Sequence, residues 1–239
     1  MQYKLYYWPG IPGRAEFVRL AFEASGRPYV DVARRPAQVF RAMAKFLDGG
    51  PRGPDRPPFA PPFLEAGRLL IGQTAAILFY LGPRLGLAPK DEVGRLWLHQ
   101  LQLTIADWLA EVHDTHHPIA VSLYYEHQKR EARRRARHFR DERLPKFLRY
   151  FERVLGGTST GYVLGRSLSY VDLSLFQMLA GLRYAFPRAM SRLEPDVPRL
   201  RALHDRVATQ PRIAAYLASR RRLAFNQQGI FRHYPELDG

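Results

Sequence analysis

Two adjacent polar residues, Gln73 and Thr74, stand at the point where an alanine-rich helical pattern begins. The first backbone N–H groups of a helix have no partner within the helix, so they can bind a carboxylate together with a nearby hydroxyl or amide side chain. The same two residues could instead cap the helix, and one side chain can serve both roles. The pair is therefore a candidate carboxylate site whose alternative is a helix cap.

A second group of chemically active side chains is the run His113-Asp114-Thr115-His116-His117. His113 and His117 have the four-residue spacing of two metal ligands on one helix face. No further acid or histidine partner is identifiable elsewhere in the sequence, and Pro118 ends the segment. We therefore interpret the run as a polar helix end or a pocket lining and expect no metal.

Residues 1–82 predict a small α/β domain that would position Gln73 and Thr74. Apolar runs bounded by Gly or Pro indicate strands, and apolar residues at every third or fourth position indicate helices. The opening strand, helix and strand should form a right-handed βαβ crossover. The expected strands are Tyr3 to Trp8, Pro28 to Val32, Phe63 to Leu64 and Leu69 to Ile71, and the expected helices are Ala15 to Ser25 and Gln73 to Leu81.

The first of these helices has polar residues before and between its apolar ones, namely Arg14, Glu16, Arg19 and Glu23. This pattern predicts an amphipathic helix with a polar face. Residues 33–60 are less regular. A short helix is expected over Gln38 to Leu47, and the Gly- and Pro-rich residues after it predict a long exposed connection.

The second half of the chain predicts an all-α helical bundle over residues 93–239, after a Gly- and Pro-containing linker at residues 83–92. Leu173 to Tyr184 is apolar almost all round, which is typical of a helix at the centre of a core. Ser169 precedes this helix with Asp172 three residues later, a spacing that predicts a reciprocal cap. Pro145 predicts a kink in an earlier helix.

The composition is that of a globular protein with a basic surface. Lysine and arginine number 37 against 22 acidic residues, for a net charge of +15 and a pI near 10.4. The arginines are spread over every segment, so we expect no nucleic-acid partner, with the basic segment Lys129 to Arg143 as the alternative. Cysteine is absent, which excludes disulfides and a cysteine nucleophile. No apolar run reaches the ~18–20 residues of a membrane span, and the opening residues lack a signal-peptide pattern, so we expect a cytoplasmic protein without membrane contact.

Four motifs, in the same order along the chain, resemble those of the soluble glutathione S-transferases, most closely of the classes that use tyrosine. The resemblance covers nearly the whole sequence. The motifs are Lys4-Leu5-Tyr6-Tyr7-Trp8 before Gly13-Arg14-Ala15-Glu16, then Pro62-Phe63-Leu64, then Gln73-Thr74-Ala75-Ala76-Ile77, and last Ser169 with Asp172. The resemblance implies a thioredoxin-like domain at residues 1–82, a linker at 83–92 and an all-helical domain at 93–239.

The resemblance also implies chemistry for the tyrosines. Tyr7 occupies the position of the family's catalytic tyrosine, whose hydroxyl would donate a hydrogen bond to the sulfur of glutathione and lower its pKa. The thiolate so favoured is the nucleophile. Tyr6 is the rival, but successive strand residues point to opposite faces, so only one of the two can serve. Arg14 would add positive charge near the sulfur. Asp172 resembles the family's helix-capping acid, which has a structural role.

Glutathione is the expected co-substrate, and the resemblance implies which residues of the first domain would bind each part of it. Gln73 and Thr74 match the pair that binds its γ-glutamyl end. Pro62 would be a cis-proline, and Pro61 stands where the family's residue bonds the cysteinyl part through its backbone. A proline there keeps the carbonyl acceptor but has no N–H donor. Lys45 and Arg41 are the candidates for the glycine carboxylate.

The expected reaction joins the glutathione thiolate to a hydrophobic electrophile, a detoxification chemistry, in a pocket between the two domains. Trp8, His113 and Tyr124 are the candidate residues of that pocket. The family also suggests a homodimer with Asp107 and Glu111 facing the partner. The missing donor at Pro61 keeps one alternative open, because fold does not fix function: a non-catalytic binding or interaction protein on the same scaffold.

Overall fold

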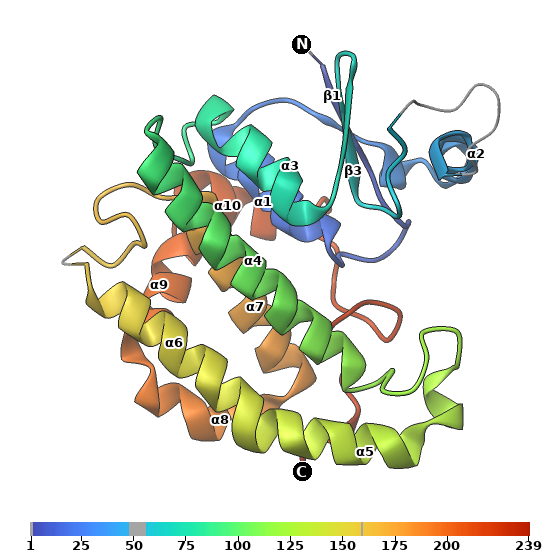
Figure 1. Ribbon diagram of the computed structural model, residues 1–239, viewed down its shortest axis with the longest axis vertical. Coiled ribbons are helices and arrows are strands. Elements are labelled where there is room, and N and C mark those ends of the chain that lie inside the picture. The colour runs from blue at the N-terminus through green and yellow to red at the C-terminus, as the bar shows by residue number, and fades with distance from the viewer. Residues whose placement is uncertain (1, 48–55, 159) are drawn as a thin grey trace. The chain divides into compact units, whose positions relative to one another are not determined.

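The computed structural model describes residues 2–47, 56–158 and 160–239, without the side chains of residues 36–38. Its contacts divide the chain into two compact units (Figure 1). The first consists of Met1–His99 with Pro211–Ala224, and the second of Gln100–Gln210 with Phe225–Gly239. The linker expected at residues 83–92, between domains at residues 1–82 and 93–239, remains a prediction. What the contacts add is a late segment, Pro211–Ala224, that packs with the first unit.

The first unit contains a four-stranded sheet in the order β2-β1-β3-β4. Strand β1 pairs parallel with β2 and antiparallel with β3, and β3 pairs antiparallel with β4. The parallel β1–β2 pair on either side of α1 confirms the predicted βαβ unit, and the hairpin confirms the two later strands. The bounds are β1 Tyr3–Tyr6, β2 Val30–Asp31, β3 Phe63–Ala66, β4 Leu69–Gly72, α1 Ala15–Ser25, α2 Pro36–Leu47, α3 Thr74–Leu81 and α10 Pro211–Leu217, with short 3-10 turns η1 Val32–Arg34 and η2 Gly82–Arg84.

Helix α1 is buried on more than its apolar side. Phe17, Leu20 and Phe22 pack in the core as predicted. However, the expected polar face is wrong, because Glu16 and Arg19 are 0% exposed. They are buried as partners of one another, with Arg19 Nη1 3.1 Å from Glu16 Oε2. A buried charge is tolerated where opposite charges and hydrogen bonds replace water, and these two side chains supply opposite charges to each other. Arg19 Nη2 is buried without a hydrogen-bond partner among the described residues.

Helix α2 covers a second apolar cluster of the first unit. Tyr6 and Phe63 of the sheet pack there with Val39 and Met43 of the helix. The short helix expected from residue 38 therefore exists and begins at Pro36. The exposed connection expected after it falls largely on residues 48–55, which lie outside the described part of the chain.

The second unit is helical, as predicted. The side chain of Trp108 is fully buried and stacks on Phe147 and Phe151, with ring centroids 5.3 and 5.8 Å apart. Helix α7 is buried almost all round, which confirms its predicted central place. The bounds are α4 Glu92–Asp114, which belongs to both units, η3 Tyr125–His127, α5 Lys129–His138, α6 Leu144–Gly156, α7 Tyr170–Ala185, α8 Pro187–Leu193, η5 Glu194–Asp196, α9 Pro198–Ala208 and α11 Pro235–Asp238.

The predicted kink at Pro145 takes the form of a change of helix. Helix α5 passes into a π-helical turn, η4 Phe139–Arg143, and α6 begins at Leu144 with Pro145 in its first turn. A proline is accommodated there because the first N–H groups of a helix need no partner within it. Among residues 2–47, 56–158 and 160–239, no helix combines the length and apolar character that crossing a membrane requires.

The predicted reciprocal cap of α7 is confirmed. Ser169 Oγ accepts from the Asp172 N–H at 3.3 Å, and Asp172 Oδ2 accepts from the Ser169 N–H at 2.7 Å. The Val163 N–H also donates to Asp172 Oδ1 at 2.8 Å. Burial raises the pKa of Asp172 to about 6, against the opposing effect of these hydrogen bonds.

Candidate active site

Tyr7 follows strand β1 and places its hydroxyl at the N-terminus of helix α1. The side chain is buried, and its hydroxyl oxygen accepts a hydrogen bond of 2.9 Å from the Arg14 N–H. This bond uses the oxygen only as an acceptor, so the hydroxyl hydrogen can be donated to another group. Tyr7 is therefore arranged as a hydrogen-bond donor at a helix N-terminus, where negative charge is stabilised.

Tyr6 is engaged elsewhere. Its hydroxyl donates to Glu65 Oε2 at 2.9 Å, and its ring stacks on Phe63 with centroids 4.8 Å apart. Burial, followed by the bond to Glu65, raises the pKa of Tyr6 above its ordinary value. Successive strand residues face opposite sides of a sheet, and here only Tyr7 faces the start of α1.

The protonation state of Tyr7 is that of a hydrogen-bond donor. Burial raises its pKa above the ordinary value, and the Arg14 N–H, with the charges of Arg14 and Arg19, opposes this rise. The net shift is upward, so the hydroxyl keeps its proton near neutral pH. Tyr7 can therefore stabilise an anion by donating a hydrogen bond but is poorly suited to remove a proton.

Gly13 allows the Tyr7 hydroxyl to approach the helix. Its φ of +45° lies in the region that favours glycine. A Cβ built on Gly13 would lie 2.2 Å from the Tyr7 hydroxyl oxygen and 2.5 Å from its Cε1. No side chain fits between this backbone and the tyrosine ring.

The Gln73 and Thr74 pair lies beside the same helix terminus. Thr74 Oγ1 donates to the Arg14 carbonyl oxygen at 3.3 Å. Gln73 is exposed and has φ +63°, an unusual value for a residue with a Cβ. Its carbonyl oxygen accepts the Ile77 N–H at 2.9 Å, while its side chain makes no capping hydrogen bond. The side-chain cap that the sequence left open for Gln73 is therefore not formed.

The proline pair before β3 has the predicted isomer, since the Pro61–Pro62 bond is cis. Both prolines are buried. Arg14, at the start of α1, is half-buried. The structure thus brings Tyr7, Arg14 and Thr74 together through the Arg14 backbone, and Pro61 and Pro62 stand directly before the strand that pairs with β1.

The two candidates on α2 are not joined to this group. Arg41 and Lys45 are exposed, and the Lys45 Nζ lies 5.7 Å from the centroid of the Phe46 ring. In the part of the chain that the structure describes, no hydrogen bond links either of them to Tyr7 or Thr74. Their part in binding remains a proposal.

The candidates for the co-substrate site fall in different units. Trp8, in the first unit, is 41% exposed, and its ring lies 6.5 Å from that of Phe40. In the second unit, Tyr124 is 75% exposed, while the His113 ring stacks on His117 with centroids 5.0 Å apart. Among the described residues no group of three or more His, Asp or Glu side chains has the arrangement of a metal site.

A buried charge network next to the site was not predicted. Arg19 donates from Nη1 to the Pro12 carbonyl oxygen at 3.0 Å and from Nε to Asp31 Oδ2 at 2.8 Å. It therefore holds the turn that precedes Gly13. Glu16 Oε1 accepts in turn from the Tyr216 hydroxyl at 2.6 Å and from Arg222 Nη1 at 2.5 Å.

No local pattern in the sequence marks this network. Glu16 and Tyr216 are separated by 200 positions. The one available signal is a surplus of charge on α1, which an exposed helix explains equally well.

Comparisons with known proteins agree with this fold. A family model described as "Glutathione S-transferase, C-terminal domain" matches residues 113–220. The chain is 25% identical over 209 residues to the glutathione S-transferase of Plasmodium yoelii yoelii, covering 87% of this chain and 90% of that protein. It is 26% identical over 227 residues to glutathione S-transferase 1 of Ascaris suum, covering 92% and 97%.

Solved structures show the same architecture. The Pi-class glutathione S-transferase of Onchocerca volvulus aligns with a TM-score of 0.68 at 24% identity, covering 91% of this chain and 92% of that one. Prostaglandin synthase D of Nilaparvata lugens aligns with a TM-score of 0.69 at 21% identity, covering 92% and 98%. The fold is thus a thioredoxin-like domain with a helical domain. The helical part of the chain thus matches a glutathione S-transferase family model, and most of the chain is similar to proteins named glutathione S-transferase, which are transferases.

Proposed function

We propose that the protein is a glutathione transferase that conjugates the sulfur of glutathione to an electrophilic small molecule. The observation that carries the proposal is the Tyr7 hydroxyl. It accepts the Arg14 N–H at 2.9 Å and keeps its own hydrogen for a ligand at the N-terminus of α1. The relatives named glutathione S-transferase, which match most of the chain, support the same activity.

In the proposed mechanism Tyr7 donates its hydrogen bond to the glutathione sulfur. A bond to the charged form of a thiol lowers its pKa, so more thiolate is present near neutral pH. The Arg14 N–H polarises the tyrosine hydroxyl, and the Arg14 charge favours the anion. With an aryl halide, a sulfur–carbon bond forms and the carbon–halogen bond breaks. The halide leaves, and the thiol proton passes to solvent.

Binding of glutathione is proposed for the residues around this hydroxyl. Gln73 and Thr74, at the start of α3, would take the carboxylate of the γ-glutamyl end, because helix N-termini attract anions. Pro61 would offer its carbonyl oxygen to the cysteinyl part, next to the cis-proline Pro62. Arg41 and Lys45 would meet the glycine carboxylate from α2.

The test compares Tyr7→Phe with Tyr6→Phe, measuring kcat/KM against a reactive aryl halide as a function of pH. Loss of the Tyr7 hydroxyl removes a hydrogen bond that stabilises the thiolate. It should lower kcat/KM at neutral pH by about tenfold or more and move the increase of kcat/KM with pH to higher pH. Tyr6→Phe should retain the profile. An unchanged profile in Tyr7→Phe together with a loss of activity in Tyr6→Phe would overturn the assignment of Tyr7.

The second candidate is a non-catalytic binding or interaction protein, and Pro61 is the observation that favours it. Proline has no N–H to donate where the family holds glutathione. Calorimetry at millimolar glutathione separates the two candidates. Binding with turnover of the aryl halide supports the transferase, binding without turnover supports the second candidate, and no binding overturns the transferase proposal.

The remaining assignments rest on the resemblance. Trp8, His113 and Tyr124 are proposed for the hydrophobic electrophile, and a cytoplasmic location and a homodimer belong to the same proposal. For the dimer, Asp107 is exposed and can face a partner. Glu111 is already bound within its own chain by Arg143, at 2.6 Å. Sedimentation velocity of Asp107→Arg against the unchanged protein tests the dimer. The dimer should weaken because the negative charge proposed for the interface is replaced by a positive one.

A further inference from the structure

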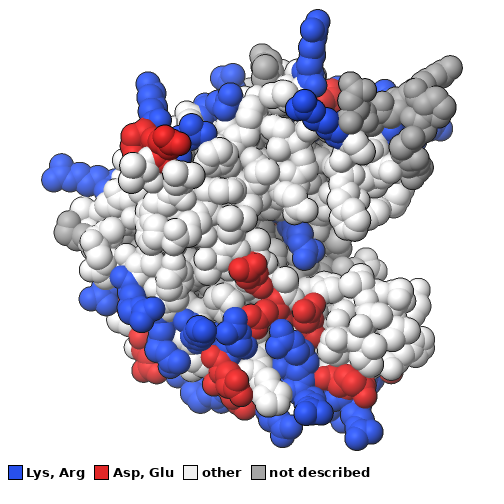
Figure 2. Space-filling model, in the orientation of Figure 1, with Lys and Arg blue, Asp and Glu red and all other residues white. Residues whose placement is uncertain are grey.

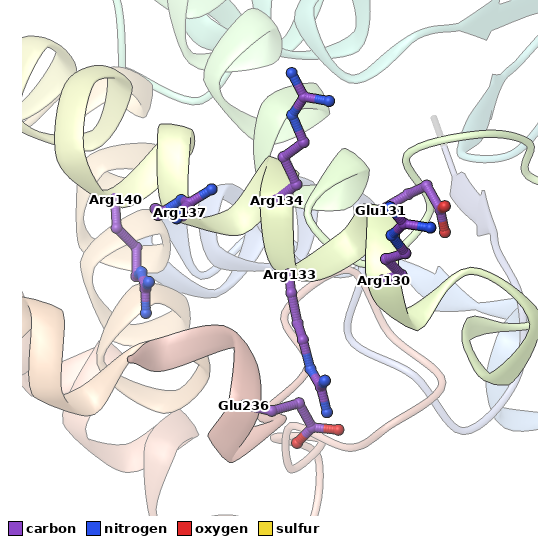
Figure 3. A pocket seen from close by; sticks show the side chains of 7 residues that line it. All are labelled: Arg130, Glu131, Arg133, Arg134, Arg137, Arg140 and Glu236. Carbon is purple, nitrogen blue, oxygen red and sulfur yellow. The ribbon is translucent and has the colours of Figure 1, made fainter.

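A groove of about 670 Å³ lies beside helix α5 in the second unit (Figure 3). Five arginines line it, together with Glu131 and Glu236. The proposed glutathione site does not use any of these residues. The arginines are Arg130, Arg133, Arg134, Arg137 and Arg140.

The spacing of the arginines aligns them along the helix. Intervals of three and four residues return to one side of an α-helix, and the π-helical turn η4 carries Arg140 onward from α5. At 1.5 Å per residue, the distance from Arg130 to Arg140 is about 15 Å along the axis. The groove therefore offers a guanidinium group on each successive turn.

Two arginines of the same segment lie outside the groove and pair with a carboxylate. On another side of the same segment, Arg135 and Arg143 both pair with Glu111, at 3.5 and 2.6 Å. Over the described residues, none of the five groove arginines forms an ion pair within 4.0 Å. Five guanidinium groups and two carboxylates, Glu131 and Glu236, line the groove, so it keeps an excess of positive charge.

Arg140 shows the consequence at the level of single atoms. Its Nε and Nη1 are buried, and no hydrogen-bond partner for them exists in the described part of the protein. A buried guanidinium N–H without an acceptor destabilises the fold unless a ligand supplies one. Figure 3 shows the Arg133 and Arg140 side chains extending toward the same side of α5. An anion in the groove would provide the missing acceptors.

The chemistry of the groove selects the kind of anion. A guanidinium is a planar fork that binds phosphate oxygens in pairs, and a row of forks fits several phosphoryl groups better than one. None of the described residues that line the groove is aromatic, so nucleobases have no stacking partner there. On the face seen in Figure 2, Lys and Arg side chains gather over the part where α5 and α6 lie in Figure 1.

We propose that this groove binds a linear oligophosphate of about three phosphoryl groups, either free or as the phosphate chain of a nucleoside triphosphate. Arginine side chains from neighbouring turns of α5 hold the phosphoryl groups between them, and Arg140 lies at one end of the row. Glu236 sits at the edge of the groove, where the Tyr125 hydroxyl donates to its Oε1 at 2.9 Å. Its carboxylate opposes the bound anion and limits the affinity.

The experiment is calorimetric titration of the full chain with inorganic tripolyphosphate, monophosphate and ATP at about 0.15 M salt. Tripolyphosphate should bind about tenfold or more tightly than monophosphate, because a longer chain meets more guanidinium groups. Equal affinity for ATP and tripolyphosphate identifies the phosphate chain alone as the ligand, and tighter ATP binding identifies the nucleotide. Tighter binding of random duplex DNA than of either would overturn the proposal.

The matched variants carry the same change of charge in two places. The groove variant is Arg133→Gln with Arg137→Gln and Arg140→Gln, and it should bind tripolyphosphate about tenfold or more weakly. The control variant changes three exposed arginines elsewhere and should keep its affinity. Equal losses of tripolyphosphate affinity in both variants would show an effect of overall charge and would overturn the proposed site. The control substitutions are Arg68→Gln, Arg201→Gln and Arg220→Gln.

A second measurement does not depend on the folding of the groove variant. Glu236→Gln removes the carboxylate that opposes the anion, so tripolyphosphate should bind more tightly to it than to the unchanged protein. Unchanged or weaker binding would contradict the proposal. Conjugation of glutathione to an aryl halide should be the same in all these variants, because the groove and the Tyr7 site share no residue.

Discussion

Thr74 Oγ1 donates to the carbonyl oxygen of Arg14 at 3.3 Å. The N–H of the same residue, Arg14, binds the Tyr7 hydroxyl at 2.9 Å. One backbone residue thus joins the proposed thiol-activating tyrosine to the proposed carboxylate-binding pair. Displacement of the turn at residues 12–14 is expected to affect both.

Gly13→Ala tests this turn directly. A Cβ there would lie 2.2 Å from the Tyr7 hydroxyl oxygen, so the ring must move away from the helix N-terminus. We expect kcat/KM toward an aryl halide to fall about tenfold or more and the free energy of unfolding to drop by about 1–3 kcal/mol. Gly10→Ala is the control, because its φ is also positive but a Cβ there meets nothing within 4 Å. Equal effects of both would attribute the loss to backbone strain alone.

Gln73→Gly should separate stability from binding. The φ of +63° at Gln73 strains a residue with a Cβ, and glycine relieves that strain. The free energy of unfolding should rise by about 1 kcal/mol, while affinity for glutathione falls because the amide is lost. Thermal melting and calorimetry measure the two. Gln73→Ala keeps the strain and removes the amide, so a gain in stability there would contradict the explanation.

Arg19 should be essential to the first unit. Arg19→Met leaves the buried Glu16 and Asp31 carboxylates without one of their cations, and we expect unfolding to become easier by about 3–5 kcal/mol. Denaturant titration measures the change. Arg19→Lys keeps the charge but cannot reach Asp31, Glu16 and Pro12 together, so its effect should be intermediate. Arg220→Met, at an exposed arginine, is the control and should change little.

His116 should make the protein sensitive to acid. Burial lowers the pKa of His116 to about 2, so the folded protein keeps it neutral at a pH where the unfolded chain protonates it. Stability from this group is complete above pH ~6.5 and is lost as the pH falls toward 2. The loss is about 2 kcal/mol at pH ~5. Asp172 acts in the opposite direction between about pH 4 and 6, because burial raises its pKa to about 6.

Substitution isolates the histidine from these other groups. His116→Gln cannot titrate, so the difference in unfolding free energy between pH ~7 and ~5 should shrink by about 2 kcal/mol relative to the unchanged protein. His138→Gln, at an exposed histidine, should leave that difference as it was. An identical pH dependence in the His116 variant would show that another group is responsible.

The sequence predicted those features that depend on local patterns. Strand periodicity placed β1, β3 and β4, and the spacing of Ser169 and Asp172 predicted the cap of α7. The cis bond before Pro62 followed from a motif. Alternation along β1 also separated the two tyrosines, because Tyr6 reaches Glu65 on one face while Tyr7 meets Arg14 on the other.

The features missed are those made by contacts between distant parts of the chain. Glu16 and Arg19 have the pattern of a solvated helix face, and only Tyr216 and Arg222 make their burial possible. The arginines of α5 are visible in the sequence as a basic run. Their separation into paired and unpaired members depends on Glu111, which lies on another helix.

The return of Pro211–Ala224 to the first unit has a consequence for synthesis on the ribosome. Domains that fold as they emerge usually do so from the N-terminus, at ~5–20 residues per second. The Tyr216 hydroxyl that caps Glu16 emerges 200 residues after it, a delay of about 10–40 s. During that time the buried carboxylate of the nascent chain lacks its late partners. The unit whose synthesis begins first is therefore completed only after Gln100–Gln210 of the second unit has been made.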